Sequence, residues 1–129
     1  MSKTIVHTDA APAAVGPYSQ AVALPAQARL VFLSGQIGLV PATGALVSND
    51  FSAQVRQSFS NMTAVIEAAG GTLHSIVKLT LFLTDLEQFA TANAIMAEML
   101  PQPFPARSTV GVASLPKGAQ FEVEAIIAV

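Results

Sequence analysis

Residues 51–84, FSAQVRQSFSNMTAVIEAAGGTLHSIVKLTLFLT, decide the fold, because here the hydrophobic pattern changes from the period of a helix to that of a strand. In the first part, apolar residues recur every three or four positions and predict one apolar stripe along a helix. These residues are Phe51, Val55, Phe59, Met62, Ile66 and Ala69. Asp50 or Asn49 can cap the start of this helix, and Gly70-Gly71 supplies a left-handed end.

The second part, residues 76–84, alternates as a strand does. Lys78 and Thr80 mark one face as partly polar, and the other face is apolar, with Val77, Leu79, Leu81 and Leu83. A second helix is expected to run to Leu100. Asp85 and Gln88 resemble a capping box at its start, and Pro101 with Pro103 ends it. We expect one side of this helix to pack in the core, with Leu86, Phe89, Asn93, Met96 and Leu100.

The flanking segments predict further strands. Residues 30–35 are typical of a short buried strand. Residues 37–40 and 45–47 predict a hairpin around the turn at 41–44. Nearer the N-terminus, residues 10–14 predict an irregular segment. Residues 108–113 and 121–129 predict two more strands, separated by a turn at 116–118. The order strands, helix, strand, helix, strands indicates a single α+β domain over residues 1–129, with both helices on one face of a sheet.

The composition predicts self-association. Hydrophobic residues make up 52% of the 129 residues and charged residues 11%, whereas about 25% charged residues are typical. A domain of this size cannot bury so much apolar surface alone, and the second sheet face needs a cover. We therefore expect a closed homo-oligomer.

Several classes of function are disfavoured. The formal net charge is −2, and the six Lys and Arg residues are scattered, so no nucleic-acid partner is expected. There are no cysteines, and His7 and His74 stand far apart without ligand-spaced acids, so no metal is expected. Nucleotide-binding and nucleophile-elbow motifs are absent. Without a signal sequence or an apolar run near ~18 residues, we expect a cytoplasmic protein with no membrane partner.

Three charged residues are candidates for a functional site. Arg107 stands where a proline-rich loop meets an apolar strand, a place where a long charged side chain seldom lacks a partner. It either pairs with a structural carboxylate, extends to solvent or binds a ligand. Glu122 and Glu124 share one face of a strand. One interpretation is that both carboxylates lie on a solvated strand edge. The other is that one of them is partly desolvated, with a raised pKa, and exchanges protons with water or substrate.

Two uncharged segments are weaker candidates. Tyr18, the only tyrosine, lies in the rigid segment Gly16-Pro17-Tyr18 and is either amphipathic packing or a donor to a substrate oxygen. Ser34-Gly35 closes an apolar strand, where a glycine lets a ligand approach the backbone.

Five segments in this order resemble the Rid family, close to its reactive-intermediate deaminase branch, and the similarity covers essentially the whole chain. The segments are AAVGPYSQA (13–21), SGQIG (34–38), NMTAV (61–65), PARS (105–108) and EVEAI (122–126). The resemblance implies a chorismate-mutase-like α+β fold and a homotrimer around a central barrel-like core, with active sites between subunits. It also implies cofactor-free hydrolysis of 2-enamine and 2-imino acids, such as 2-aminoacrylate and 2-iminobutyrate, to 2-keto acids and ammonia.

The resemblance also assigns roles to residues. Arg107 matches the arginine that binds the substrate carboxylate, and Glu122 the acid that positions or activates the attacking water. Tyr18 matches a tyrosine of the cleft. The remaining matches line the substrate-binding site: Ser34, Gly35, Asn93 and Thr109. Bidentate guanidinium–carboxylate pairing suits a small planar acid.

The chain departs from the family pattern at three places. Thr109 stands where many deaminases carry cysteine, Met96 replaces an aromatic residue, and the link from Asn93 to Arg107 is short. Because the pocket rim is altered, a related deaminase of a larger substrate such as 2-aminomuconate stays open. A regulatory module that binds small carboxylates without catalysis also stays open, since some Rid-like proteins keep the cleft without known catalysis.

Overall fold

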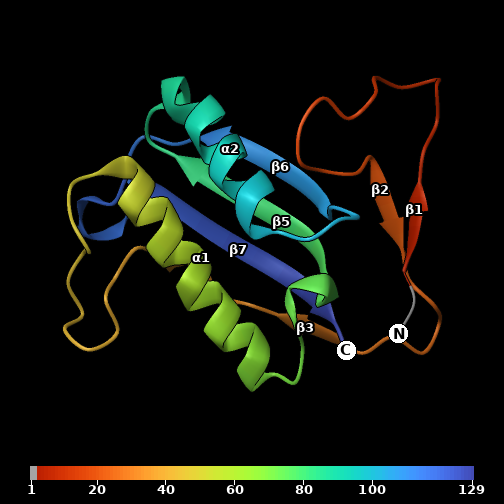
Figure 1. Cartoon of the computed structure of the whole chain (residues 1–129), viewed down its shortest axis with the longest axis horizontal. Helices are drawn as coiled ribbons and strands as arrows, with labels where there is room; N and C mark the ends of the chain where they lie inside the picture. The colour runs from red at the N-terminus through yellow and green to blue at the C-terminus, as the bar shows by residue number, and fades with distance from the viewer. Residues whose placement is uncertain (1–2) are drawn as a thin grey trace.

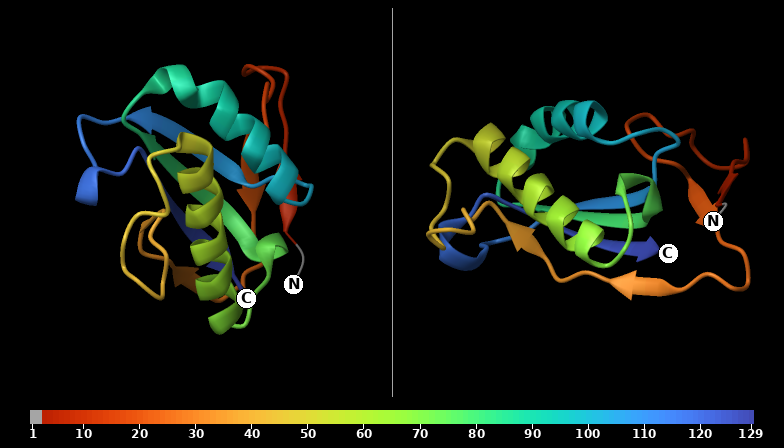
Figure 2. Two further views of the ribbon diagram at one scale, coloured as in Figure 1. Left: turned by 60° about the vertical axis from the view of Figure 1, so that its left-hand side comes forward. Right: turned by 60° about the horizontal axis from the view of Figure 1, so that its bottom comes forward.

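The computed structural model describes residues 3–129 and is built on a five-stranded mixed sheet (Figure 1). The strands run in the order β3-β7-β5-β6, and β4 also pairs with β7. Their bounds are Leu30–Phe32 (β3), Gln36–Ile37 (β4), Ile76–Leu83 (β5), Ala106–Gly111 (β6) and Phe121–Ala128 (β7). Helices α1 (Phe51–Ala68) and α2 (Phe89–Met99) cover one face of the sheet (Figure 2). The predicted α+β arrangement, with two helices on one face of a mixed sheet, is confirmed.

Helix α1 forms as its sequence predicts. The Asp50 carboxylate accepts a hydrogen bond from the Ala53 N–H at 2.9 Å and caps the helix, and Gly70 takes a φ of +87° just after its end. The predicted stripe packs into the core through Phe51, Val55, Phe59, Met62 and Ile66.

The central strands β5 and β7 supply the other half of the core. Their antiparallel register sets Leu79, Leu81 and Leu83 beside Ala125, Val123 and Phe121, and all six are buried against the helices. The alternate residues of both strands point to the opposite face. The predicted two-faced character is confirmed for residues 78–83. At the start of β5 the register shifts, and Ile76 joins the core cluster where Val77 was predicted. The core lies between the helices and one sheet face.

Of the two predictions for residues 30–47, the buried strand is wrong and the hairpin is confirmed in part. The strand that starts at Leu30 lies at an edge of the sheet and is not buried, since Phe32 is 70% exposed. The hairpin around residues 41–44 is present but short: Leu39 and Leu46 form an antiparallel bridge, flanked by backbone hydrogen bonds from the Val40 N–H to Ala45 and from the Val47 N–H to Gly38. Just before it, β4 pairs with β7 from the far end of the chain. Apolar runs do not reveal whether their neighbour is local or distant, and for β4 the neighbour is distant.

Helix α2 also differs from its prediction. The Asp85 carboxylate caps a 3₁₀ turn, Leu86–Gln88, by accepting from the Glu87 N–H at 3.0 Å, and α2 starts only at Phe89. The buried face of α2 is rotated from the predicted one, and its buried residues are Ala92, Ile95, Met96 and Leu100. Phe89 is 38% exposed, and Asn93 is half-buried.

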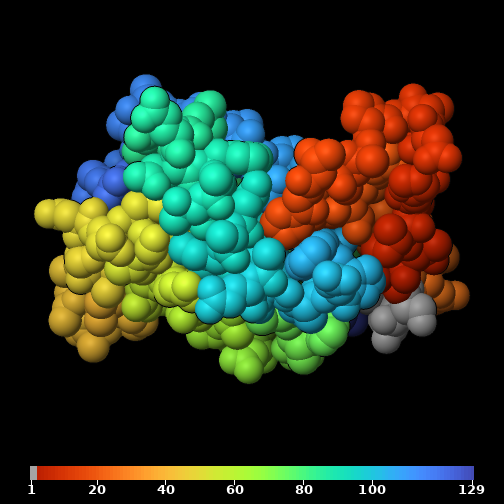
Figure 3. Space-filling model, turned by 45° about the horizontal axis from the view of Figure 1, so that its top comes forward, coloured from red at the N-terminus to blue at the C-terminus, as the bar shows by residue number. Residues whose placement is uncertain are grey.

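The N-terminal segment forms a two-stranded antiparallel ribbon that the sequence did not predict. Strand β1 (Thr4–Val6) pairs with β2 (Ala21–Ala23), and both are too short to show a period. Their connection, residues 7–20, lies beside β6 and α2 (Figure 3).

The second face of the main sheet is not covered by a helix within residues 3–129. It presents an apolar and polar mixture of exposed or half-buried side chains: Leu30, Phe32, Lys78, Phe82, Val110, Glu124 and Ile126. Among the described residues, no helix is long and apolar enough to cross a membrane.

Candidate functional site

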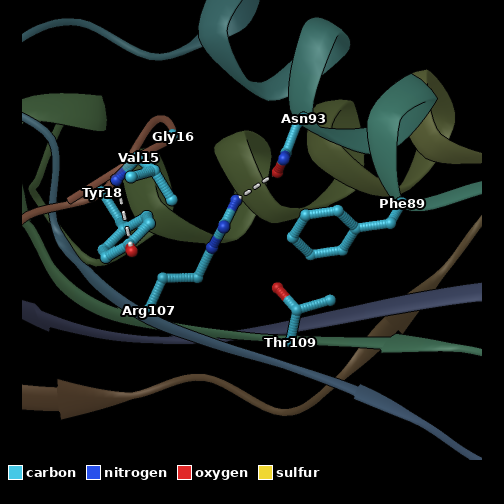
Figure 4. A pocket seen from close by; sticks show the side chains of 7 residues that line it. All are labelled: Val15, Gly16, Tyr18, Phe89, Asn93, Arg107 and Thr109. Carbon is cyan, nitrogen blue, oxygen red and sulfur yellow. Dashed lines mark hydrogen bonds between the residues drawn. The ribbon is translucent and has the colours of Figure 1, made fainter. Parts of the chain in front are cut away.

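Arg107 reaches into a cleft between β6, α2 and the β1–β2 connection. The cleft has a volume of about 260 Å³ and is lined by Val15, Gly16, Tyr18, Phe89, Asn93, Arg107 and Thr109 (Figure 4). Parallel pairing sets Arg107 beside Leu79, so its side chain leaves the sheet on the helix-covered face. It is half-buried there, and burial lowers the pKa of its guanidinium, with an opposing effect from Tyr18. An arginine remains charged in spite of such a shift.

Neutral groups hold the guanidinium. Its Nη1 donates to the Asn93 Oδ1 at 2.5 Å and lies 3.7 Å from the Met96 sulfur. The aromatic rings of Tyr18 and Phe89 lie 4.9 Å and 5.5 Å from its central carbon. Among the described residues, no carboxylate forms a salt bridge with Arg107. The alternative of a structural ion pair is therefore not supported, and the remaining N–H donors are available to an anion.

Tyr18 belongs to a short wall of the cleft that hydrogen bonds hold against β6. Its N–H donates to the Gly16 carbonyl at 2.8 Å, and its hydroxyl oxygen accepts from the Val15 N–H at 3.4 Å. The next residue, Ser19, donates from its N–H to the Pro105 carbonyl at 2.9 Å and from its hydroxyl to the Phe104 carbonyl. Because the phenol accepts from the backbone, its own proton can be donated to a ligand.

Thr109 contributes an unpartnered hydroxyl. It lies two residues after Arg107 on the same face of β6, and its oxygen faces the cleft in Figure 4. Its Oγ1 is the one buried side-chain polar atom among the described residues that lacks a hydrogen-bond partner. Such atoms are uncommon in folded proteins because leaving a buried hydroxyl unsatisfied is unfavourable. A bound ligand can supply the missing partner.

Glu122 lies on the opposite face of the sheet. Antiparallel pairing sets it beside Phe82, whose side chain points away from the helices. Burial raises the pKa of the Glu122 carboxyl, and repulsion from Glu124 raises it further. Gly35 lies against this carboxyl so closely that a side chain there would overlap it, and exposed Ser34 precedes Gly35. Within one chain the sheet therefore separates Glu122, Gly35 and Ser34 from Arg107.

The structure thus brings four predicted site residues together: Tyr18, Asn93, Arg107 and Thr109. The short link from Asn93 does not displace it from the cleft. The sequence reasoning gave no role to Val15 or Gly16 and assigned Phe89 to the core. The one available signal for Phe89 was Asn93, a polar residue four positions later on the same helical face.

Fold and site together define a class of protein: a small α+β domain whose cleft, with its positively charged guanidinium, can hold a small carboxylate between the sheet and a helix. Residues 8–129 match the family model described as Endoribonuclease L-PSP. The chain belongs to this family, which is the Rid family that the five motifs indicate.

Individual relatives are similar to this chain over nearly their full lengths. A protein of Salmonella typhimurium, called 2-iminobutanoate/2-iminopropanoate deaminase, is 51% identical over 98% of this chain and 97% of its own length. The crystal structure of RidA from a Psychrobacter species has a TM-score of 0.76 at 46% identity, covering 98% of this chain and 99% of that one. The structure of Escherichia coli TdcF with bound serine has a TM-score of 0.74 at 40% identity, covering 98% of each chain.

The unpartnered hydroxyl of Thr109 predicts that its removal lowers ligand affinity without lowering stability. Thr109→Val removes the hydroxyl at nearly constant shape, so the melting temperature should stay equal or rise while the affinity for 2-ketobutyrate falls about 3- to 10-fold. Calorimetry measures both quantities. Thr109→Ser keeps the hydroxyl and should bind like the original protein. A lower melting temperature in Thr109→Val would show that the hydroxyl already has a partner in the ligand-free protein.

Proposed function

We propose that this protein hydrolyses small 2-imino and 2-enamine acids, such as 2-iminobutyrate and 2-aminoacrylate, to 2-keto acids and ammonia without a cofactor. The observation that carries the proposal is Arg107: a half-buried guanidinium in a small cleft, oriented by Asn93 and free of a carboxylate partner among the described residues. The deaminase name of the Salmonella relative supports the reaction class.

The dimensions of the cleft support a small substrate. About 260 Å³ accommodates a molecule of a few heavy atoms, and bidentate pairing with the guanidinium fixes a planar carboxylate at two points. The TdcF structure contains serine, which carries such a carboxylate. The rings of Tyr18 and Phe89 flank Arg107 and leave an apolar wall for a short side chain.

The complete site requires a second subunit. Glu122 and Gly35 lie on the sheet face that the helices leave open, whereas Arg107 lies on the other. When a second copy packs the open face of its sheet near the cleft, its Glu122 approaches the first copy's Arg107. A homotrimer around a central barrel-like core, with three such sites, meets this requirement and covers Phe32 and its apolar neighbours.

The proposed mechanism uses Arg107 of one subunit and Glu122 of another. Arg107 holds the carboxylate and thereby fixes the adjacent imine carbon. The Glu122 carboxylate takes a proton from a water molecule, the oxygen bonds to that carbon, and the C=N electron pair moves to nitrogen. The nitrogen takes the proton held by Glu122, which gives the neutral carbinolamine. Glu122 then removes the hydroxyl proton as the C=O bond forms and the C–N bond breaks, and it passes this second proton to the departing nitrogen, which leaves as ammonia. An enamine first takes a proton at carbon and releases one from nitrogen to become the imine.

Ribonuclease activity, which the family description names, has little support in this chain. RNA binding depends on several Lys or Arg residues that neutralise phosphates together. This chain has six such residues and a formal net charge of −2. Arg107 itself is half-buried and engaged with Asn93.

Arg107 gives the direct test. Arg107→Ala and Arg107→Lys should each lower imine hydrolysis about 100-fold or more, because neither side chain reproduces the two hydrogen bonds of the fork. The assay generates 2-iminobutyrate with a threonine dehydratase and follows its disappearance. Arg56→Ala, which removes an exposed arginine paired with Glu98, is the matched control and should keep full activity. Binding of 2-ketobutyrate without turnover by the unmodified protein would favour a regulatory carboxylate-binding module.

A mixing experiment tests the shared site. Arg107→Ala and Glu122→Gln subunits should each be inactive alone. Co-expressed in equal amounts, they should recover activity in about one quarter of the sites, because a site is complete when Arg107 and Glu122 come from different variants. The recovered rate is compared with that of each variant assembled alone. A mixture as inactive as its parents would mean that both residues act within one chain.

The raised pKa of Glu122 predicts the pH profile. The ionised carboxylate accepts the proton of water, so kcat/KM should fall on the acidic side as Glu122 becomes protonated, at a higher pH than for an ordinary glutamate. Glu124→Gln removes a like charge, lowers the pKa of Glu122 and should move this acidic limb to lower pH. An unchanged limb in Glu124→Gln would assign the titration to another group.

A further inference from the structure

The β1–β2 connection forms one wall of the cleft, and burial holds only its inner end, where Pro17 is buried and Gly16 and Tyr18 are half-buried. Residues 4–15 are exposed, and Val15 is 91% exposed although it lines the cleft. Contacts within the outer part, such as the 3.1 Å bonds from Ala10 N–H to Thr8 Oγ1 and between His7 and Asp9, join residues of the segment to one another only. The wall therefore depends on hydrogen bonds that tie this segment to the ribbon.

The Gln20 side chain supplies these ties. Its Oε1 accepts from the Thr8 N–H at 2.7 Å, and its Nε2 donates to the Thr8 carbonyl at 3.1 Å. The same nitrogen donates to the Pro12 carbonyl at 2.8 Å and lies 3.4 Å from the Ala11 carbonyl. A primary amide offers one acceptor and two donors, as a strand backbone does. The carboxamide thus extends the β1–β2 ladder beyond the pair Val6–Ala21. It ties Gln20 to the start of the connection at Thr8 and to its middle at Pro12.

Gln20 is also close to the chemistry along the chain. It follows Tyr18 and Ser19 directly, and Ser19 is bonded to the loop just before Arg107. Ser19 fixes the inner end of the wall to β6, and Gln20 fixes the outer end, so that Val15 and Gly16 are held between two anchors. Fixing backbone before binding removes an entropic cost that the ligand would otherwise meet.

We propose that Gln20 is a positioning residue that preorganises the cleft wall formed by Val15, Gly16 and Tyr18. It does not touch the ligand, and its effect on turnover rests on the proposed function. Because Ser19 still holds Tyr18 when Gln20 is replaced, loss of the amide should weaken binding and leave the chemical step nearly intact.

The test compares Gln20→Met, which keeps the size but removes every amide hydrogen bond, with Gln27→Met, the same change at an exposed glutamine before β3. Nitrogen-15 relaxation should give backbone order parameters near 0.8 for residues 9–16 in the unmodified protein and below about 0.6 in Gln20→Met. The KM for 2-iminobutyrate and the dissociation constant of 2-ketobutyrate should rise about 3- to 10-fold, with kcat within about twofold. Gln27→Met should change none of these quantities.

Gln20→Glu separates the donor role from simple filling of space. It keeps the acceptor for the Thr8 N–H but places a carboxylate against the carbonyls of Thr8 and Pro12, so it should loosen the wall at least as much as Gln20→Met. Unchanged order parameters or unchanged ligand affinity in both variants would overturn the proposal. Relaxation and product binding need no turnover, so a protein that fails to hydrolyse imines would refute the proposed function and leave the role of Gln20 open to measurement.

Discussion

A half-buried guanidinium without a carboxylate partner among the described residues is the constraint around which the site is organised. Burial disfavours the charged form of Arg107, and the fold offsets this cost with an amide oxygen from Asn93, a thioether from Met96 and two aromatic faces. These groups orient the charge without neutralising it. An anion that enters the cleft therefore finds donors that are already aligned and a charge still to be balanced.

Strand pairing divides the proposed chemistry between two faces. Because β5 pairs in parallel with β6 and antiparallel with β7, Arg107 leaves the sheet toward the helices and Glu122 leaves it on the open face. A sheet cannot bring these side chains together within one chain. The open face, with Phe32 and Ile126, therefore has two proposed roles: it joins subunits, and it carries half of each active site.

Two features of the cleft favour ligand binding at the expense of the stability of the folded chain. The Thr109 hydroxyl is buried without a partner, and the outer part of the β1–β2 connection, residues 7–15, is exposed and held by hydrogen bonds of Gln20. Each arrangement is less stable than a close-packed alternative. Together they leave space for a ligand beside Arg107, which a packed apolar cluster would have filled.

Long, regular patterns made several elements predictable from the sequence alone. The stripe of α1 and the alternation of residues 76–84 depend on neighbours along the chain, and so does a cap at Asn49 or Asp50, of which the structure selects Asp50. The motifs also pointed to Arg107 before its surroundings were known. Only the tertiary structure decided that β4 pairs with β7, that Phe89 faces the cleft, and that Glu122 lies across the sheet from Arg107. These features depend on strand register and helix rotation, which are set by packing between segments far apart in sequence.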